Sequence, residues 1–370
     1  MRDTSARTSD RRMFATSRAI SRMSTSQARK LLLAVALIFL TASAAVADGQ
    51  ARLAPWYQNR DAAVSLRFDD GLESHATKVI PQLNRYGFRA VFLVSPGSAQ
   101  YRARREFWEQ AVPAMGHHLG NHTMNHRGAR TIEEADYEIG EAARTIWRVQ
   151  PRESKLLVFA SGGGKKLWGG KEWEQADPAY RQLVQKYHLI DLYDGNHHYL
   201  SVRAGMGSGD LCGSLDTTLA RGGHQSYAFH GIGRSSFLEW VKMMIRGYGM
   251  TISEETFSGF LGCLDERRQR FWVAPLDDIL KYEEEARDAA VRTTRSDRHS
   301  ATLKLSVRTD PVLYDHPLTL ILPDQQGRIV QSVRQEREQC RVYQDAAGHV
   351  LVDVRPVNSM ITVTYSDARP

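Results

Sequence analysis

The chain is poor in cysteine, with three in 370 residues: Cys212, Cys263 and Cys340. None lies in a Cys-x-x-Cys arrangement, and an odd count leaves at least one thiol unpaired within the chain. Cys212 and Cys263 fall in the same predicted domain, so they are the pair that we expect to form a disulfide in an oxidising compartment. Three free thiols remain the alternative.

Beyond the first thirty residues, which hold many arginines, the chain lacks a basic run with interleaved aromatic residues. We therefore predict no nucleic-acid binding despite the formal net charge of +7. It also lacks an apolar run long enough for a comfortable membrane span, since the run at 31–40 is too short. That run follows two basic residues and precedes the small residues Ala45-Val46-Ala47, as in an export signal. We expect a signal peptide over 1–47, with Met23 as an alternative start. The mature protein would be periplasmic or secreted, with no stable membrane span.

Predicted strands and helices alternate from Ala62 to residue 290. The strands are expected at 63–68, 89–94, 118–119, 156–160, 188–192, 225–230 and 270–274, and the helices at 73–86, 103–115, 131–149, 177–187, 234–248, 253–262 and 277–290. The Gly-rich region 194–223 predicts loop and short strands. Repeated βα units favour a parallel (β/α) barrel over 48–290, with its functional site at the carboxyl ends of the strands.

The pattern changes after the barrel. Residues 291–300 are polar and predict a linker. Residues 301–370 alternate apolar and polar positions without a helical period, as in 303–307, 318–322 and 350–354, which predicts a small antiparallel β-sandwich. This domain could bind sugar or cap the barrel. We favour capping, because no aromatic platform stands out.

Two short motifs carry the chemistry. The strand over 62–68 ends at Asp69-Asp70-Gly71, and His122 and His126 are four residues apart in His-Thr-Met-Asn-His. On a helix this spacing puts both imidazoles on one face, within reach of one metal ion. With Asp70 they would supply three protein ligands and leave a position open for water, the layout of a hydrolytic zinc site. Taken singly, the histidine pair is more often a surface or capping feature, and Asp-Asp-Gly is more often a turn.

At these residues the chain resembles the NodB-homology polysaccharide deacetylases. Phe68-Asp69-Asp70-Gly71 and His122-Thr123-Met124-Asn125-His126 are similar to that family's first two motifs, and Phe229-His230-Gly231 is similar to its last. The resemblance covers about residues 60–285. It implies a distorted, seven-stranded (β/α) barrel and one divalent metal ion, for which we expect Zn²⁺, with Co²⁺ or Ni²⁺ also suited.

The resemblance also implies roles. Asp70, His122 and His126 would bind the metal, Asp69 would be the general base, and His230 would donate a proton to the leaving group. Taken alone, Asp69 could cap the following helix and His230 could be an ordinary buried histidine. His198 and His224 are further candidates for lining the groove. Ser161 and Gly162 could cradle substrate or form a tight turn, and Trp168 could stack on a sugar or pack in the core.

Two departures from the family pattern concern the partner of the proposed base. The segment 159–164 lacks the third-motif arginine that pairs with the base, while Arg67 stands where the first motif has Thr or Ser. Arg67 could replace the missing arginine, because residues i and i+2 of a strand share a face. We favour the simpler interpretation, in which Arg67 points to solvent or pairs with another acid such as Glu73. The family's fourth motif has a weak counterpart in 190–194.

Together these features predict an exported metal-dependent deacetylase that acts on N-acetyl or O-acetyl groups of a carbohydrate. The alternatives are a NodB-fold hydrolase of cyclic amides and a non-catalytic carbohydrate-binding envelope protein. The intact carboxylates and histidines disfavour the last of these. Neither the specific sugar nor the oligomeric state follows from the sequence.

Overall fold

The computed structural model describes residues 50–150, 154–162, 178–233, 249–324 and 327–367. The predicted signal peptide, the predicted helix 234–248 and Trp168 lie outside these ranges. All the elements discussed below lie in one compact unit, Ala51–Pro370. Within the described ranges, none of the helices is both long and apolar enough to span a bilayer.

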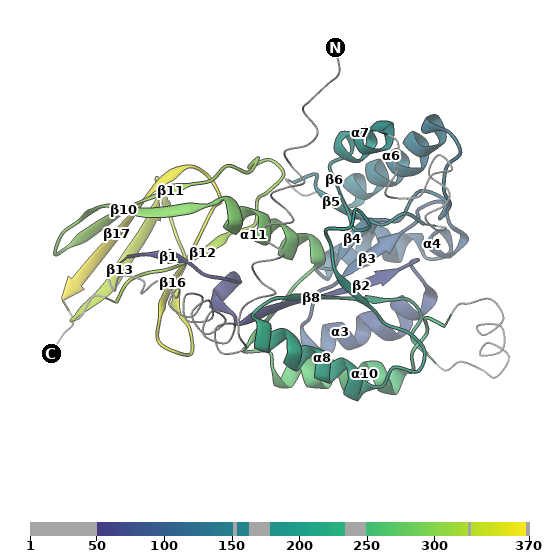
Figure 1. The fold of residues 1–370 in the computed structure, drawn as a ribbon, viewed down its shortest axis with the longest axis horizontal. Coiled ribbons are helices and arrows are strands. Elements are labelled where there is room, and N and C mark those ends of the chain that lie inside the picture. The colour runs from purple at the N-terminus through teal and green to yellow at the C-terminus, as the bar shows by residue number, and fades with distance from the viewer. Residues whose placement is uncertain (1–49, 151–153, 163–177, 234–248, 325–326, 368–370) are drawn as a thin grey trace, which may run out of the picture. The chain divides into compact units, whose positions relative to one another are not determined.

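An eight-stranded parallel sheet organises residues 62–273 (Figure 1). Its strands run in the order β6-β5-β4-β3-β2-β8-β7, and β9 attaches to β2 beside this path. The strands are β2 (Ala62–Asp69), β3 (Val91–Val94), β4 (His118–Asn121), β5 (Leu157–Phe159), β6 (Leu189–Asp191), β7 (Tyr199–Ser201), β8 (His224–Phe229) and β9 (Phe271–Val273). This parallel half-barrel confirms the predicted α/β fold class, with eight strands in place of the expected seven.

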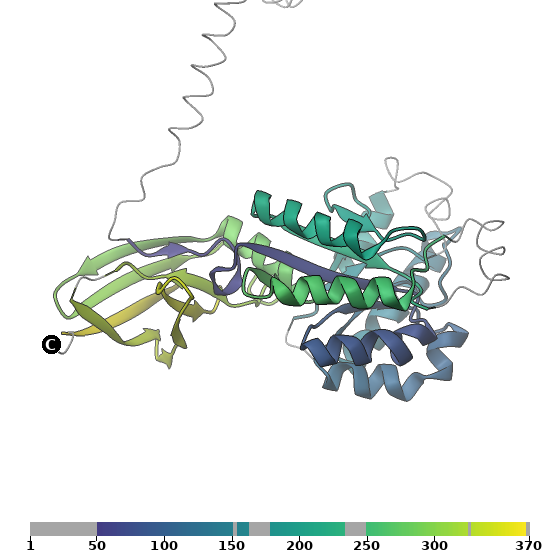
Figure 2. The ribbon, with the colours of Figure 1, turned by 90° about the horizontal axis from the view of Figure 1, so that it is seen from below.

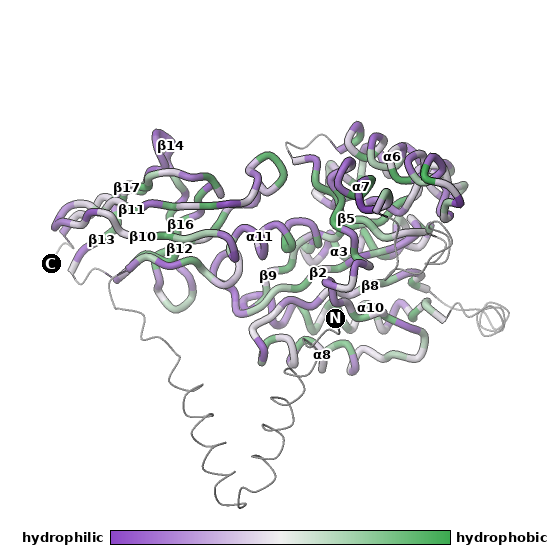
Figure 3. The backbone as a smooth tube through the Cα atoms, turned by 45° about the horizontal axis from the view of Figure 1, so that its top comes forward, coloured by the Kyte–Doolittle hydropathy of each residue, from purple (hydrophilic) through white to green (hydrophobic). Residues whose placement is uncertain are grey.

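Helices cover the outer face of the sheet. They are η2 (His75–Val79) continuing into α3 (Ile80–Tyr86), α4 (Ala99–Ala103), η3 (Phe107–Ala111) with α5 (Val112–Ala114), α6 (Ile132–Val149), α7 (Pro178–Lys186), α8 (Ser208–Arg221) and α10 (Glu254–Glu266). On this face, Leu66 and Phe68 of β2 are fully buried, and the Phe68 ring packs against Phe257 of α10. Figure 3 shows hydrophobic and hydrophilic residues alternating along α6, as expected of a helix with one buried face.

The inner face of the half-barrel is more polar and carries the site. Successive side chains of a strand point to opposite faces, so Arg67 and Asp69 lie opposite Leu66 and Phe68. Helix α11 (Leu276–Asp288) covers part of this inner face, because Leu276 joins a buried cluster with Val91, Leu93, Val158, Ala160 and Leu192. Asp69 therefore lies at the carboxyl end of the central strand β2, on the face that carries this apolar cluster.

Helix α8 corrects the sequence prediction for 194–223. The region was expected to be loop and short strands, but residues 208–221 are helical. The Gly207 N–H donates to the Asp210 carboxylate at 2.8 Å, which caps the helix start, and Gly222 ends it with φ of 64°. These capping interactions and the burial of Leu211 and Leu215 offset the low helix propensity of its glycines.

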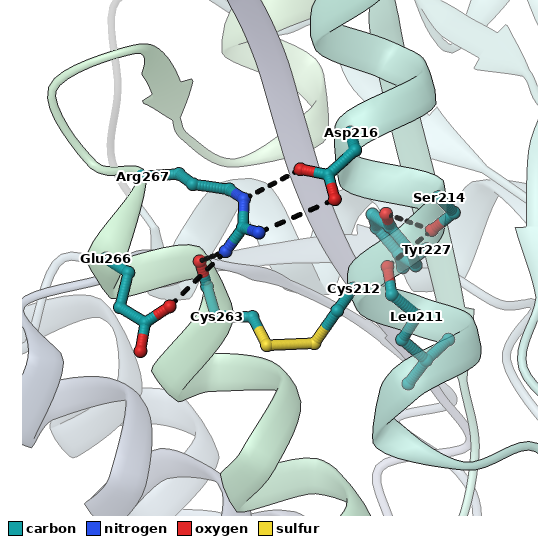
Figure 4. Close-up of a disulfide and its surroundings, with 8 residues drawn as sticks. All are labelled: Leu211, Cys212, Ser214, Asp216, Tyr227, Cys263, Glu266 and Arg267. Carbon is teal, nitrogen blue, oxygen red and sulfur yellow. Dashed lines mark hydrogen bonds and ion pairs between the residues drawn. A yellow bond between two sulfur atoms is a disulfide. The ribbon is translucent and has the colours of Figure 1, made fainter.

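The predicted disulfide is confirmed. Cys212 of α8 and Cys263 of α10 are joined across the two helices (Figure 4), which lie side by side in Figure 2. Arg267 adds an ion pair from the end of α10 to Asp216 of α8, with Nε 2.9 Å from Oδ1. Cys340 is free.

The C-terminal residues form the predicted antiparallel sandwich, with larger boundaries than expected. One sheet has the order β1-β12-β16-β15 and the other β10-β11-β17-β13-β14. Their strands are β1 (Arg52–Leu53), β10 (Ala290–Ser296), β11 (Ser300–Ser306), β12 (Leu318–Ile321), β13 (Arg328–Gln335), β14 (Glu338–Gln339), β15 (Val342–Gln344), β16 (Val350–Val354) and β17 (Ser359–Asp367). The core of the sandwich includes Trp272 and Tyr282 from the barrel region, so the two parts pack together.

The predicted linker 291–300 is wrong. These residues form most of β10 and its turn into β11, where the Asp297 carboxylate accepts from the backbone N–H groups of His299 and Ser300. Strand β10 lies at the edge of its sheet, with most of its polar side chains exposed. Edge strands commonly carry charged residues that prevent further pairing, which is why the segment resembles a linker in sequence.

Candidate metal and catalytic centre

The first motif lies where β2 ends in a tight turn. Asp70 and Gly71 both have left-handed backbone conformations, with φ of 80° and 59°. This conformation is unusual for a residue with a side chain. Asp69 remains in the strand, with its carboxylate buried at 1% exposure, while Asp70 is partly exposed. The turn therefore separates two adjacent carboxylates into two environments.

The His122–His126 segment is a loop after β4, and its predicted helical conformation is wrong. Thr123 and His126 both have positive φ, at 66° and 55°, and α6 begins later, at Ile132. The loop nevertheless brings the two rings together, with centroids 4.9 Å apart. Each Nε2 approaches Asp70 Oδ1, at 3.2 Å from His122 and 2.9 Å from His126.

The second motif is held in this loop by Glu138, a residue that the sequence analysis missed. Glu138 lies on α6 and is 1% exposed. Its Oε2 accepts from the Asn125 backbone N–H at 2.8 Å, and its Oε1 accepts from the Asn125 side chain at 2.7 Å and from Arg127 Nε at 3.0 Å. The Glu138 carbonyl also accepts from Met124 N–H. The sequence signal is an acidic residue on the largely apolar buried face of α6.

The end of β5 orients one histidine and limits the space beside the other. His122 Nδ1 is 2.8 Å from the Ala160 carbonyl oxygen, so Nδ1 carries the proton and Nε2 is left to face Asp70. A Cβ on Gly162 would lie 2.9 Å from both Cα and Cδ2 of His126. Gly162 thus allows the close approach of the two loops. Ser161 beside it is buried, and its hydroxyl has no partner among the described residues.

Arg67 and Asp69 form a bidentate ion pair on the inner face of β2, which overturns the interpretation favoured above. Arg67 Nε is 2.7 Å from Asp69 Oδ1, and Nη2 is 2.6 Å from Oδ2. Both side chains are 1% exposed. Burial alone would raise the pKa of Asp69, but the charge and hydrogen bonds of Arg67 outweigh it and hold that pKa below its usual range. Glu73 pairs with Arg104 instead.

The loop after β6 fixes Arg67 from the other side. Arg67 Nη2 donates to the Tyr193 hydroxyl at 3.1 Å, and the guanidinium lies 5.5 Å and 5.1 Å from the ring centroids of Tyr193 and Tyr199. Asp191, in the segment singled out as a weak fourth motif, accepts from the Tyr193 backbone N–H at 3.0 Å. Burial raises the pKa of Asp191 to about 7.

His230 lies at the end of β8 and faces the same carboxylate. Its Nε2 is 3.9 Å from Asp69 Oδ2, and its side chain is 24% exposed. Its Nδ1 has no hydrogen-bond partner among the described residues. The structure therefore places His230 beside the buried Asp69.

The other candidate histidines are not part of the ligand cluster. His198 and His224 line a cavity of about 160 Å³ with Arg67, Ser226 and Glu283. His224 pairs in register with Ala63, six residues before Asp69, which is about 20 Å along the strand. The histidines available to the centre are thus His122, His126 and His230, as the motifs predicted.

The chemistry of the donor set fits a divalent cation. One carboxylate oxygen and two imidazole nitrogens, from Asp70, His122 and His126, all lie within 4.8 Å of one another. This is the ligand number and type of a catalytic zinc site. His126 is 43% exposed, so one side of the cluster remains open to water or substrate.

Fold and site together form a parallel half-barrel with a histidine–carboxylate cluster at the carboxyl end of its sheet. Residues 57–167 match the family described as polysaccharide deacetylase. This match confirms the resemblance found in the sequence and covers both motifs of the cluster.

A curated relative and two solved structures are also similar. A gellan lyase from a Bacillus species is 24% identical over 293 residues, which cover 74% of this chain and 11% of that protein. The chain thus spans about a tenth of that relative. A probable polysaccharide deacetylase from Pseudomonas aeruginosa is 11% identical, with a TM-score of 0.40 over 61% of this chain and 92% of the other. A family 4 carbohydrate esterase from Streptomyces lividans is 17% identical, with a TM-score of 0.34 over 57% and 91%.

Proposed function

We propose that the protein is an exported, metal-dependent deacetylase that hydrolyses acetyl groups on a carbohydrate. One observation carries the proposal: a three-residue cation site lies directly beside a buried carboxylate that Arg67 keeps ionised. A hydrolytic centre of this kind needs a place for a Lewis acid and, within reach of it, a separate base.

Asp70, His122 and His126 would hold the cation. Bound there, it would polarise the acetyl carbonyl and make an adjacent water more acidic. The geometry of the cluster favours this set, because the contact of His122 Nδ1 with the Ala160 carbonyl oxygen aims Nε2 at Asp70 Oδ1, 3.2 Å away. We expect Zn²⁺, although Co²⁺ and Ni²⁺ would suit the same donors.

Asp69 would accept the proton of the attacking water. Arg67 occupies one lone-pair direction on each oxygen of its carboxylate, and each oxygen retains a second. Because Arg67 holds the pKa of Asp69 below its usual range, the ionised carboxylate is favoured. His230 Nε2 would then donate a proton to the departing amine or hydroxyl, since it lies on the Asp69 side and is partly exposed.

Acetate release tests the proposal. The purified protein is incubated with chitooligosaccharides and with acetylated xylan, with and without a chelator. Release from one substrate, lost with chelator and restored by Zn²⁺, is the expected result, and the substrate that responds distinguishes N-acetyl from O-acetyl chemistry. Binding of both carbohydrates without acetate release from either, after zinc loading, would instead identify a binding protein.

A further inference from the structure

A buried histidine connects the two segments that carry the site residues on β2 and β8. His75 follows the Asp69-Asp70-Gly71 turn and is 0% exposed. Its Nδ1 accepts from the Leu72 backbone N–H at 3.2 Å, and its Nε2 is 2.7 Å from the His230 carbonyl oxygen. The ring therefore bridges the first motif and the strand end that carries His230.

The two contacts require one protonation state. A carbonyl oxygen only accepts, so Nε2 carries the proton, and a backbone N–H only donates, so Nδ1 is bare. That is a neutral imidazole. Burial agrees with it, since it lowers the pKa of His75 to about 4. The ring is packed at 5.4 Å from the Phe68 centroid and 5.8 Å from the Phe92 centroid, so it has little freedom to turn.

A second contact joins the same two segments. The Ile232 backbone N–H donates to Ser74 Oγ at 3.3 Å. Ser74 and His75 thus bind the backbone of Ile232 and His230, respectively. Strands β2 and β8 are paired up to Phe68 and Phe229, and among the described site side chains of the two segments His230 approaches Asp69 at 3.9 Å. The contacts of His75 and Ser74 extend this pairing to the residues just beyond it, where His230 and the Asp69–Asp70 pair lie.

We propose that His75 is a positioning residue for the deacetylation reaction, which sets the distance between His230 and the Asp69–Asp70 pair through its two backbone hydrogen bonds. His75 is fully buried and is not one of the three converging ligand residues. The inference rests on the proposed function for its kinetic consequence, while the connection itself can be tested without any activity.

The chain offers a matched control. His117 is 1% exposed, accepts from the Ala90 backbone N–H through Nδ1 at 3.2 Å, and contacts Phe92 with ring centroids 5.6 Å apart. Its Nε2 is 3.2 Å from Asn84 Oδ1. His117 thus resembles His75 in burial and bonding but lies before the amino end of β4, away from the site.

The experiment compares His75→Leu, His75→Gln and His117→Leu in the full chain. We expect both leucine variants to lower the melting temperature. His75→Leu alone should lower kcat by about tenfold to hundredfold with little change in KM, since small displacements of catalytic groups have costs of this size. His75→Gln should recover much of the loss, because an amide both donates and accepts. Equal effects of His75→Leu and His117→Leu on kcat, relative to their stability losses, would overturn the proposal.

Amide hydrogen exchange separates failure of this inference from failure of the proposed function. His75→Leu should accelerate exchange in both peptides 70–75 and 228–232, while His117→Leu should affect the peptide around Ala90. Unchanged exchange at 228–232 in His75→Leu overturns the connection whatever the activity. A wild-type protein that releases no acetate, with the expected exchange pattern, overturns the deacetylase function and leaves the connection standing.

Discussion

Arg67 and Asp69 form a buried bidentate ion pair within one strand, separated by a single residue. The family that this chain resembles draws the corresponding arginine from a different motif. Here the partner of the proposed base comes from the base's own strand, and Tyr193 from the loop after β6 fixes the guanidinium.

Replacing Arg67 by Met should lower turnover sharply without removing the metal. Asp69 would lose its counter-charge while remaining buried, so its pKa should rise and the acidic limb of the pH–rate profile should move to higher pH. The variant should also be less stable by about 3–5 kcal/mol, the usual cost of leaving one buried charge unpaired. Acetate release measured across pH reports the turnover and the acidic limb, and elemental analysis reports the zinc content. An unchanged rate and an unchanged acidic limb would exclude a base-orienting role for Arg67.

The metal assignment predicts about one divalent ion per chain, lost in His126→Ala. His126 supplies one of three converging ligand atoms, whereas the exposed His198 lines a cavity away from them. Elemental analysis should therefore show zinc depletion in His126→Ala and full zinc content in His198→Ala. Full zinc occupancy in His126→Ala would contradict the ligand set.

Glu138→Gln should weaken metal binding from a distance. The amide that replaces the carboxylate cannot accept both Asn125 hydrogen bonds and the Arg127 bond, so the loop between His122 and His126 loses support. We expect a stability loss of about 1–3 kcal/mol, together with a lower zinc affinity in chelator competition. Glu141→Gln is the control, because Glu141 lies on the same helix but pairs with Arg144 at the surface. Wild-type zinc affinity in Glu138→Gln would show that the loop does not need this support.

Acid should destabilise the protein partly through its buried histidines. Burial lowers the pKa of His117 to about 3, whereas an unfolded histidine titrates near pH 6.5. Between these values the unfolded chain binds the additional proton, so the stabilisation is complete above about pH 6.5 and declines as the pH falls toward 3. Urea unfolding at several pH values should show a smaller decline for His117→Gln than for the wild type. Parallel curves would mean that His117 does not contribute.

The disulfide predicts thiol counts and a stability difference. Denatured, unreduced protein should give one free thiol, Cys340, and reduced protein should give three. Cys212 and Cys263 are 51 residues apart, so reduction should cost about 2–4 kcal/mol of stability. Cys212→Ser with Cys263→Ser should reproduce that loss without added reductant. Three free thiols in the unreduced protein would contradict the bond.

The sequence predicted the barrel because strand and helix periods alternate. It predicted the cluster from the spacing of His122 and His126, from the aspartate pair at a strand end, and from the resemblance to a known family. The predicted secondary structure was wrong where the local sequence pattern and the tertiary context disagree. Residues 208–221 contain glycines that indicate loop, but capping by Asp210 and burial make them helical. The His122–His126 loop reaches the same convergence as a helix would, through positive φ at two residues and the hydrogen bonds of Glu138.

The residues that the sequence analysis missed share a detectable signal. Glu138 lies on α6 with the buried residues Ala135, Ile139 and Ala142, and His75 precedes Val79 and Leu83 at helical spacing. A charged or titratable residue on an apolar helix face has to find a partner when it is buried. The sequence cannot tell which partner, because the backbone groups that His75 binds come from two segments about 155 residues apart.

Because both members of the Arg67–Asp69 pair belong to three consecutive residues of a central strand, the spacing between them is set by the strand and not by a loop. An arginine at the equivalent strand position, together with an aromatic hydroxyl opposite it, should be enough to transplant the pair into another barrel of this type. The loop that usually provides the arginine would then no longer need to supply it, and could be redesigned to admit bulkier polymers without disturbing the base.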